Sequence, residues 1–314
     1  MAQNTERFTS GNLTIKYSPQ FPLKPDARMK LKCSFDLAVR ALKATIEALD
    51  AIGSQPELSL FPMQAVNEAA YKVLRGHFHL PEPVRDNRVD RQVWEAWRPS
   101  VRHIADSLRQ MHLGLTKPVT IADSHATVVG RELKGRLANF VEQDKQTYEI
   151  EEMVMGKAGA DAGRRERFST AYDQAALAGQ ILSSGRRGMV SPKKAVVAAM
   201  SPDEIARHAA NDPGVHLAAD QQGSIHLNYQ MLLDDGRINN VRVARTIVHE
   251  ASHKFCYTRD YAYAHDDGYS QLTKAQSMMN ADSYAFGTMS LYKKYYFRND
   301  ESMIKVPTGM NMNG

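Results

Sequence analysis

The chain is poor in cysteine and lacks a long hydrophobic segment, and both absences narrow what it can be. Cys33 and Cys256 are its only cysteines among 314 residues, and they lie far apart in the sequence. Two distant thiols do not form the disulfide framework of a small secreted domain. No apolar run approaches the roughly 20 residues that cross a bilayer. We therefore expect a globular protein with no membrane span.

A large excess of one sign of charge is also missing. The 40 Lys and Arg residues stand against 35 Asp and Glu residues, and the net charge of +5 is spread along the chain. The densest basic stretches, within 164–167 and 186–194, lack the interleaved aromatic residues that stack on bases. We predict that nucleic acid is not a partner of this protein.

The N-terminus has no basic segment followed by an apolar core, so it does not resemble a secretory signal. The sequence thus leaves the localisation open between the cytoplasm and export by a leaderless route. Residues 1–29 contain three prolines and no helical period. For this stretch we predict an extended N-terminal arm or a short edge strand.

The rest of the chain shows no internal repeat and no clear linker, which predicts a single domain over residues 30–314. Apolar residues recur at three- and four-residue spacing through the first part of it, and predict a helical layer over 30–115. Helices are expected there at 31–52, 63–74 and 90–111. The sheet and the active-site helices are expected over 116–300.

Beyond residue 114 the sequence contains short segments rich in β-branched residues between polar connectors. We predict an α+β fold, mainly helical, with a small mixed sheet. Strands are expected at 118–122, 147–150, 188–190 and 223–229, an exposed loop at 156–167, and a short helix at 202–208.

One predicted helix carries a pattern with chemical meaning. Apolar residues recur at helical spacing over 240–257, and among them stand His249, Glu250 and His253 in the pattern His-Glu-x-x-His. Residues four apart lie on one face of a helix, so both imidazoles can reach one zinc ion at about 2.0–2.1 Å. We predict zinc as the cofactor and both histidines as its ligands.

The glutamate between the histidines suits amide hydrolysis. A catalytic zinc with three protein ligands keeps a fourth position for water and lowers the pKa of that water to about 7. Glu250 can accept the proton and later pass it to the leaving amine. The pattern predicts a zinc-dependent endopeptidase that acts on a protein or peptide substrate, with Glu250 as the general base.

A third ligand is required, and spacing leaves several options. A histidine six residues after His253 would mark one class of zinc peptidase, but that position is Arg259. No glutamate occurs between Glu250 and Glu301, which excludes a glutamate ligand from a following helix. The remaining candidates are Asp260, His265, Asp266, Asp267 and Asp282.

Two further segments resemble a known family. The stretch Thr258-Arg259-Asp260-Tyr261-Ala262-Tyr263 resembles the Thr-x-Asp-x-x-Tyr element of the deuterolysin, or aspzincin, metallopeptidases. The later Asn280-Ala281-Asp282-Ser283 resembles the next segment of that family, which includes lysine-specific endopeptidases. The resemblance covers about residues 223–292 and implies a zincin-like fold with the sheet packed on the His-Glu-x-x-His helix. By matched position it implies Asp260 as the third zinc ligand and Tyr263 as a phenol that hydrogen-bonds the developing oxyanion.

The chain departs from that family at positions that affect loop shape and specificity. Tyr257 and Ala264 stand where the family has glycine on either side of Thr-x-Asp-x-x-Tyr. Two cysteines cannot form the disulfides of secreted members, which suggests a bacterial-type or intracellular relative. Lysine-specific relatives use an acidic pair that would fall on Asp282 and Ala285, and alanine removes half of it. Asp282 is therefore either a substrate-pocket residue or a cap of the turn at Asn280.

Two other hypotheses stay open on the sequence alone. One is a delivered effector or toxin with a narrow protein or cell-wall peptide target, which would have a secretion-system or immunity partner. The other is a non-catalytic zinc-binding module. Structural zinc sites are usually closed by four ligands, often cysteines, and the two cysteines of this chain are poorly placed for that role. The sequence favours the endopeptidase.

Overall fold

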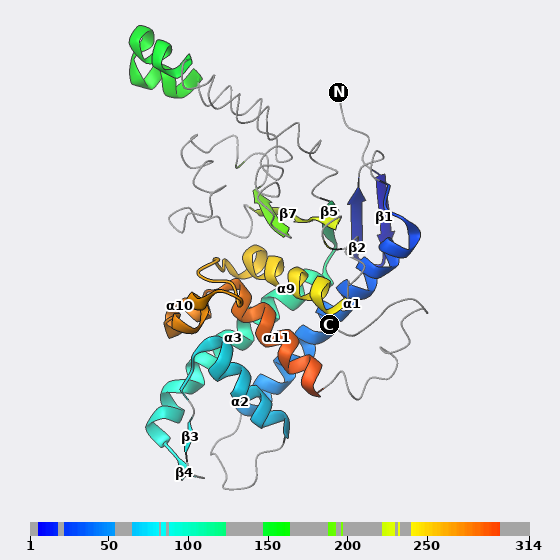
Figure 1. Ribbon diagram of the computed structural model, residues 1–314, viewed down its shortest axis with the longest axis vertical. Coiled ribbons are helices and arrows are strands. Elements are labelled where there is room, and N and C mark those ends of the chain that lie inside the picture. The colour runs from blue at the N-terminus through cyan, green and yellow to red at the C-terminus, as the bar shows by residue number, and fades with distance from the viewer. Residues whose placement is uncertain are drawn as a thin grey trace. The chain divides into compact units, whose positions relative to one another are not determined.

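The computed structural model describes residues 6–17, 22–53, 65–81, 83–85, 88–123, 147–163, 188–192, 222–229 and 240–295, with residues 196 and 232. Figure 1 labels the helices and strands. They are, in chain order, β1 Glu6–Ser10, β2 Leu13–Tyr17, α1 Pro25–Gly53, α2 Ala65–Phe78, β3 Val84–Arg85, β4 Arg88–Val89, α3 Arg91–Thr116, β5 Val119–Asp123, β6 Gly188–Pro192, β7 Gln222–Leu227, α9 Asn240–Cys256, η1 Asp267–Gln271, α10 Lys274–Met278 and α11 Ala281–Tyr295. Long helices and a small mixed sheet confirm the predicted α+β class.

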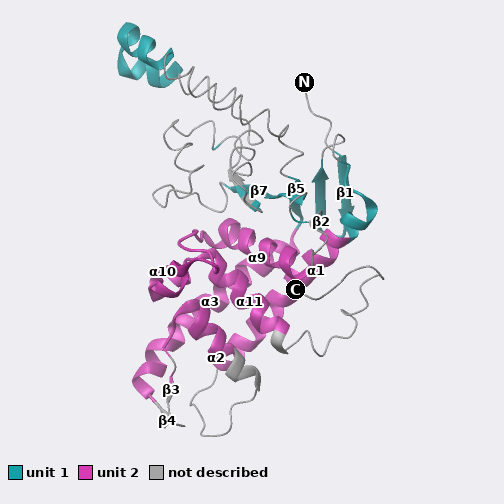
Figure 2. Ribbon diagram, viewed as in Figure 1, with its two compact units in different colours: residues 1–29, 118–236 teal, residues 30–117, 237–314 magenta. Residues whose placement is uncertain are grey.

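The chain divides into two compact units, which Figure 2 colours separately. Unit 1 comprises residues 1–29 and 118–236, and unit 2 comprises residues 30–117 and 237–314. The single domain expected over residues 30–314 stays a prediction. All residues predicted to bind the metal or to act in catalysis belong to unit 2.

Unit 1 contains a five-stranded sheet in the order β1-β2-β5-β7-β6. The β1–β2 and β6–β7 pairs are antiparallel, whereas β2–β5 and β5–β7 are parallel, so the sheet is mixed as expected. Strands β5, β6 and β7 confirm those predicted at 118–122, 188–190 and 223–229. The predicted arm contributes β1 at the edge of the sheet and β2 inside it, where every second residue is buried. The packing of this sheet on the histidine helix stays a prediction.

Two predictions in unit 1 are wrong. The strand expected at 147–150 is helical, and so is the 156–163 part of the expected loop. A short run of aromatic and β-branched residues does not by itself distinguish the two structures. Here Ile150, Met153 and Val154 recur at helical spacing among glutamates, which are good helix formers, and the helix prevails.

Unit 2 is a cluster of helices. The helices predicted at 31–52, 63–74, 90–111 and 240–257 are confirmed as α1, α2, α3 and α9. Helix α1 begins earlier than expected, at Pro25, because proline is well suited to the first helical turn, where its missing N–H has no partner to lose. The short helix expected at 202–208 lies outside the described residues.

Helix α9 packs against both α3 and α11, and α11 also packs against α2. Five apolar residues of α9 are fully buried: Val243, Ala244, Ile247, Val248 and Ala251. Burial of a valine or isoleucine side chain contributes about 1.5–3 kcal/mol to stability. The apolar face therefore anchors α9, and its opposite, partly exposed face presents both histidines.

The C-terminal end of α9 lies very close to α3. A Cβ atom placed on Gly114 of α3 would be 2.5 Å from the ring of Phe255. One residue further, the thiol of Cys256 donates a hydrogen bond of 3.0 Å to the carbonyl oxygen of Ser107. Burial raises the pKa of this thiol to about 12, so it stays protonated and contributes packing rather than reactivity.

We predict that Gly114→Ala lowers the free energy of unfolding by about 1–3 kcal/mol, because the new methyl group overpacks against Phe255. Alanine alone would favour a helix by about 1 kcal/mol over glycine. The matched control is Gly76→Ala in α2, where no atom lies within 4 Å of the added Cβ, and which should therefore be neutral or stabilising. Urea denaturation measures both; a Gly114→Ala variant as stable as Gly76→Ala would contradict the close packing.

Candidate metal centre

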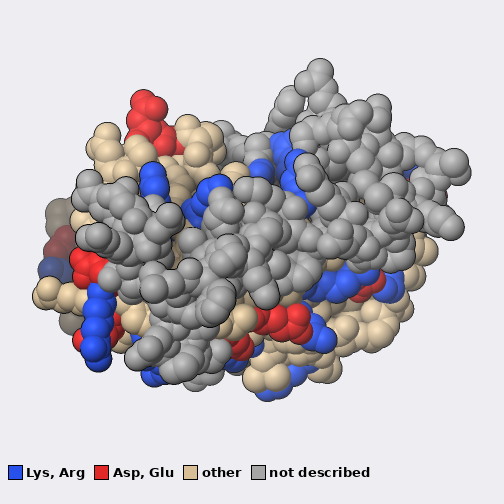
Figure 3. Space-filling view, turned by 90° about the horizontal axis from the view of Figure 1, so that it is seen from below, with Lys and Arg blue, Asp and Glu red and all other residues tan. Residues whose placement is uncertain are grey.

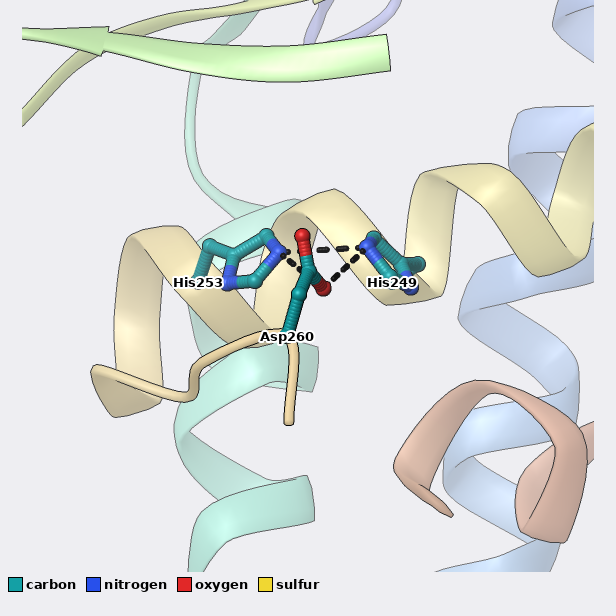
Figure 4. A group of neighbouring side chains, drawn as sticks. All are labelled: His249, His253 and Asp260. Atoms are coloured by element: carbon teal, nitrogen blue, oxygen red, sulfur yellow. Dashed lines mark hydrogen bonds and ion pairs between the residues drawn. The ribbon is translucent and has the colours of Figure 1, made fainter. Parts of the chain in front are cut away.

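Three side chains meet on the partly exposed face of α9. His249 and His253 project from consecutive turns, and Asp260 reaches both of them from the loop that follows the helix (Figure 4). Asp260 Oδ1 lies 3.1 Å from His249 Nε2 and 3.3 Å from His253 Nε2, and the two Nε2 atoms are 3.1 Å apart. Within the described part of the chain, this is the one group of His, Cys, Asp or Glu side chains close enough together to hold a metal ion.

The dimensions of the group suit a tetrahedrally bound ion. At a metal–ligand distance of about 2.0–2.1 Å, tetrahedral geometry separates the ligand atoms by about 3.3–3.4 Å. The separations here are 3.1–3.3 Å. The side chains are only 12%, 18% and 9% exposed for His249, His253 and Asp260. The group can therefore bind a metal ion, and three protein ligands leave a position for water or substrate.

Each imidazole is oriented by a hydrogen bond from its other nitrogen. His249 Nδ1 donates to Asp282 Oδ1 at 2.7 Å, and His253 Nδ1 donates to the Thr258 carbonyl oxygen at 2.8 Å. A neutral imidazole with its hydrogen on Nδ1 has its lone pair on Nε2, which is the form that binds a metal. In that neutral form both Nε2 lone pairs would point toward Asp260, where a metal ion can bind.

The charges around this group favour a cation. Burial lowers the pKa of His249, but the charge of Asp260 and hydrogen bonds to Asp260 and Asp282 outweigh burial and raise it well above its ordinary value. The pKa of His253 is also raised, against burial, chiefly by Asp260. Burial acts to raise the pKa of Asp260, yet the two imidazoles hold it far below its usual range. Asp260 is thus ionised, and a metal ion would take the place of protons on the imidazoles.

Glu250 and Tyr263, the two predicted catalytic residues, lie at the same group. Tyr263 donates a hydrogen bond from its hydroxyl to Asp260 Oδ2 at 3.1 Å, and its ring stacks on His249 with 6.2 Å between centroids. Glu250 is 3% exposed, and its negative charge raises the pKa of both histidines. The structure thus brings all five of these predicted residues together.

The loop that carries Asp260 is shaped by Tyr257 and Asn280. Tyr257 ends α9 with φ of 58°, the left-handed conformation that glycine adopts most easily and that costs other residues about 1–2 kcal/mol. Asn280 is fully buried, and its side-chain amide accepts from the N–H groups of Tyr261 and Ala262 and donates to the Ala262 carbonyl oxygen. These contacts fix the backbone directly after Asp260.

The other candidate ligands lie outside the group. Asp266 closes a turn, because its Oδ2 accepts from the Tyr263 N–H at 2.9 Å. The His265 side chain is 76% exposed and lies 3.6 Å from Asp266 Oδ1, and Asp267 begins η1. Asp282 is buried, but it contacts His249 through Nδ1 rather than through the nitrogen that faces Asp260.

Several residues contact the site or the helix that carries it in ways that the sequence does not predict. Thr258 supplies the acceptor for His253, and its hydroxyl bonds that of Ser252 at 2.7 Å. The guanidinium carbon of Arg245, one turn before His249, lies 4.0 Å from the ring centroid of Phe286 on α11. Helical spacing places Arg245 on the same face of α9 as the two histidines, but no sequence pattern predicts its contact with Phe286.

The described charged residues do not form a surface patch of one sign on the face that is shown. On the face shown in Figure 3, described Lys and Arg side chains are interspersed with Asp and Glu. None of the helices in the described ranges combines the length and apolar character that crossing a bilayer requires.

Comparison with known proteins identifies no relative: no family model, no curated protein and no solved structure matches the chain.

A second polar cluster lies where the end of α2 meets η1, and the charge of Asp282 affects the pKa of one of its histidines, His77. His77 Nδ1 and the Tyr269 hydroxyl form a hydrogen bond of 2.9 Å, and His79 Nδ1 donates to the Leu272 carbonyl oxygen at 2.5 Å. Burial and, to a smaller extent, the nearby His79 lower the pKa of His77 to about 4, although Asp282 partly offsets their effect. His77 is therefore neutral in the folded protein near pH 7.

We predict that acid destabilises the fold through His77. Between pH 6.5 and 4 the unfolded chain binds a proton on this residue and the folded chain does not, so stability falls as the pH falls, by at most about 1.4 kcal/mol per pH unit. His77→Asn should make the pH dependence shallower over this range. Urea unfolding in the presence of a chelator measures it, and data at pH 7–8, where the two slopes should agree, provide the control. Equal slopes at pH 4–6.5 would contradict the prediction.

Proposed function

We propose that this protein is a zinc-dependent endopeptidase of the zincin type, with His249, His253 and Asp260 as metal ligands. The triangle of two Nε2 atoms and one Oδ1 atom, 3.1–3.3 Å apart, carries the proposal. The resemblance of Thr258–Tyr263 to the aspzincin element supports the same ligand assignment. Two nitrogens and one carboxylate oxygen form a donor set that catalytic zinc commonly has.

When bound, zinc supplies a water of lowered pKa and polarises the scissile carbonyl group. Glu250 accepts the proton of this water on its carboxylate and returns it to the leaving amine. Its position directly after His249 on α9 fixes the carboxylate relative to both ligand histidines. Its burial keeps bulk water from competing for the proton.

Tyr263 completes the proposed machinery. Its hydroxyl hydrogen-bonds Asp260 Oδ2, so it already lies next to the ligand triangle. A rotation of this O–H toward the substrate would let it donate to the carbonyl oxygen as negative charge develops there. Its ring lies nearly parallel to that of His249, with 6.2 Å between the centroids, so the phenol is next to the proposed zinc ligands.

We predict that Glu250→Gln retains zinc but loses at least about 100-fold in peptidase activity, because the amide cannot accept a proton. Zinc content is measured by elemental analysis, and activity by cleavage of unfolded casein with and without chelator. A Glu250→Gln variant that cleaves at the wild-type rate would rule out the assigned base.

Asp260→Ala is the companion variant, since it removes a ligand and leaves the base in place. We expect it to weaken zinc binding and to abolish cleavage together. Wild-type protein with one zinc per chain and no cleavage of casein would instead point to a narrow target or a latent form, and wild-type protein without metal would favour the non-catalytic module. The delivered-effector hypothesis concerns the target of the enzyme, and it stays a prediction.

A further inference from the structure

Asp282 links three parts of unit 2 through a single carboxylate. Its Oδ1 accepts from His249 Nδ1 on α9 at 2.7 Å, and its Oδ2 accepts from the N–H of Ala264 in the ligand loop at 2.8 Å. The residue itself lies in the first turn of α11. Its side chain is 10% exposed. Both oxygens therefore have a partner inside the protein.

We propose that Asp282 is a positioning residue for His249, and not a pocket residue for a basic substrate side chain; this inference rests on the proposed function. The carboxylate fixes the tautomer and the ring orientation of His249, so that Nε2 faces Asp260. The bond to Ala264 at the same time ties the loop that carries Asp260 to α11.

The low exposure of Asp282 favours the positioning role over the role of a pocket for a basic side chain. Each carboxylate oxygen could accept a further hydrogen bond, but the imidazole of His249 and the amide of Ala264 already contact the two oxygens, and only 10% of the side chain is exposed to an incoming ammonium group. Hydrogen bonds to an ionised carboxylate are short and strong, so the two contacts hold the carboxylate toward His249 and Ala264. Ala285, one turn along α11, offers no second acid to compensate.

Zinc affinity measures this role directly. Loss of a carboxylate that orients a ligand histidine typically weakens metal binding by 10- to 100-fold, and we expect about this loss for Asp282→Ala. Asp282→Asn keeps an acceptor for His249 and should lose less. Thr288→Ala, at another buried polar residue of α11, is the matched control for altered packing and should bind zinc like the wild type. Competition with a chromogenic chelator gives the dissociation constants, and circular dichroism checks that each variant is folded.

Two further measurements distinguish a positioning role of Asp282 from a general role in stabilising the fold. Long-range ¹H–¹⁵N NMR of the zinc-loaded wild type should show the His249 hydrogen on Nδ1, and the signal should change in Asp282→Ala but not in Thr288→Ala. Matched peptides with lysine or glutamine beside the cleaved bond should keep the same ratio of kcat/KM in the wild type and in Asp282→Asn.

Unchanged zinc affinity in Asp282→Ala would overturn the inference, as would a preference for lysine that Asp282→Asn removes. A wild-type protein that binds no zinc would instead overturn the proposed function, and this inference with it.

A separate observation bears on the substrate. Arg245 and Phe286 form a second contact between α9 and α11, with the guanidinium carbon 4.0 Å from the ring centroid. Arg245 precedes His249 by four residues on α9, and Phe286 follows Asp282 by four residues on α11. Both side chains are partly exposed. Four helical residues correspond to about 6 Å along the axis, so Arg245 lies one turn from the candidate metal centre on the same face of α9.

We infer that Arg245 selects a carboxylate group of the substrate close to the cleaved bond; this too rests on the proposed function. Residues of an extended peptide are spaced by about 3.3–3.6 Å, so a side chain one or two positions from the scissile bond comes near the guanidinium. Arginine binds a carboxylate through two parallel hydrogen bonds. Stacking on Phe286 restricts the arginine side chain and lowers the entropy lost on binding.

Peptides that differ only in glutamate, glutamine or lysine at each position beside the cleaved bond test this inference. The wild type should favour glutamate at one of them by about 10-fold or more in kcat/KM, as expected for hydrogen bonds between charged groups. Arg245→Gln should lose this preference, and Arg245→Glu should favour lysine instead. Arg102→Gln, at an exposed arginine of α3, is the control and should keep the wild-type preference.

An equal preference in the wild type and in Arg245→Gln would overturn the assignment, as would a wild type that cleaves all three peptides alike. A wild type that cleaves none of them, and no casein, contradicts the proposed function rather than Arg245 alone.

Discussion

Each imidazole of the candidate site donates its Nδ1 hydrogen to a fixed acceptor, and this constraint decides which nitrogen can bind a metal. For His249 the acceptor is a carboxylate on α11, and for His253 it is the carbonyl oxygen of Thr258. Without these acceptors the imidazole rings could rotate or change tautomer. The two Nε2 atoms would then no longer be held close to Asp260 Oδ1. The fold of unit 2 places both acceptors. The packing of α9 on α11 brings Asp282 to His249, and a tight turn at Tyr257 brings the Thr258 carbonyl oxygen back to His253.

The same arrangement balances charge. Asp260, Asp282 and Glu250 bring three carboxylates to two imidazoles in a largely buried place. Buried charges of one sign are costly unless they are compensated, and here the compensation comes either from protons on the imidazoles or from a cation. Binding of a metal and release of protons are therefore linked, and the affinity for the metal depends on pH.

The sequence predicted those parts of the site that follow from periodicity. Helical spacing fixed the limits of α9 to within a residue and placed His249 and His253 on one face. Asp260 was one of five candidates by spacing, and only the family resemblance singled it out. The path of its loop depends on a left-handed Tyr257 and on the side-chain hydrogen bonds of Asn280, and neither follows a repeating pattern. The contacts of Asp282 depend on how α11 packs against α9, which no local rule provides. The helix at 147–163 was missed for a related reason, because its first residues alone fit a strand equally well.

The ligands and their hydrogen-bonding partners all come from one contiguous stretch, residues 249–282. An ion that joins positions so near in the sequence closes only short loops, and the chain entropy lost on closure is correspondingly small. The candidate metal centre thus lies within one segment of the chain and does not join parts that are remote in the sequence. Within the described residues, every donor atom of this group comes from that segment, and the described strands of unit 1 supply none.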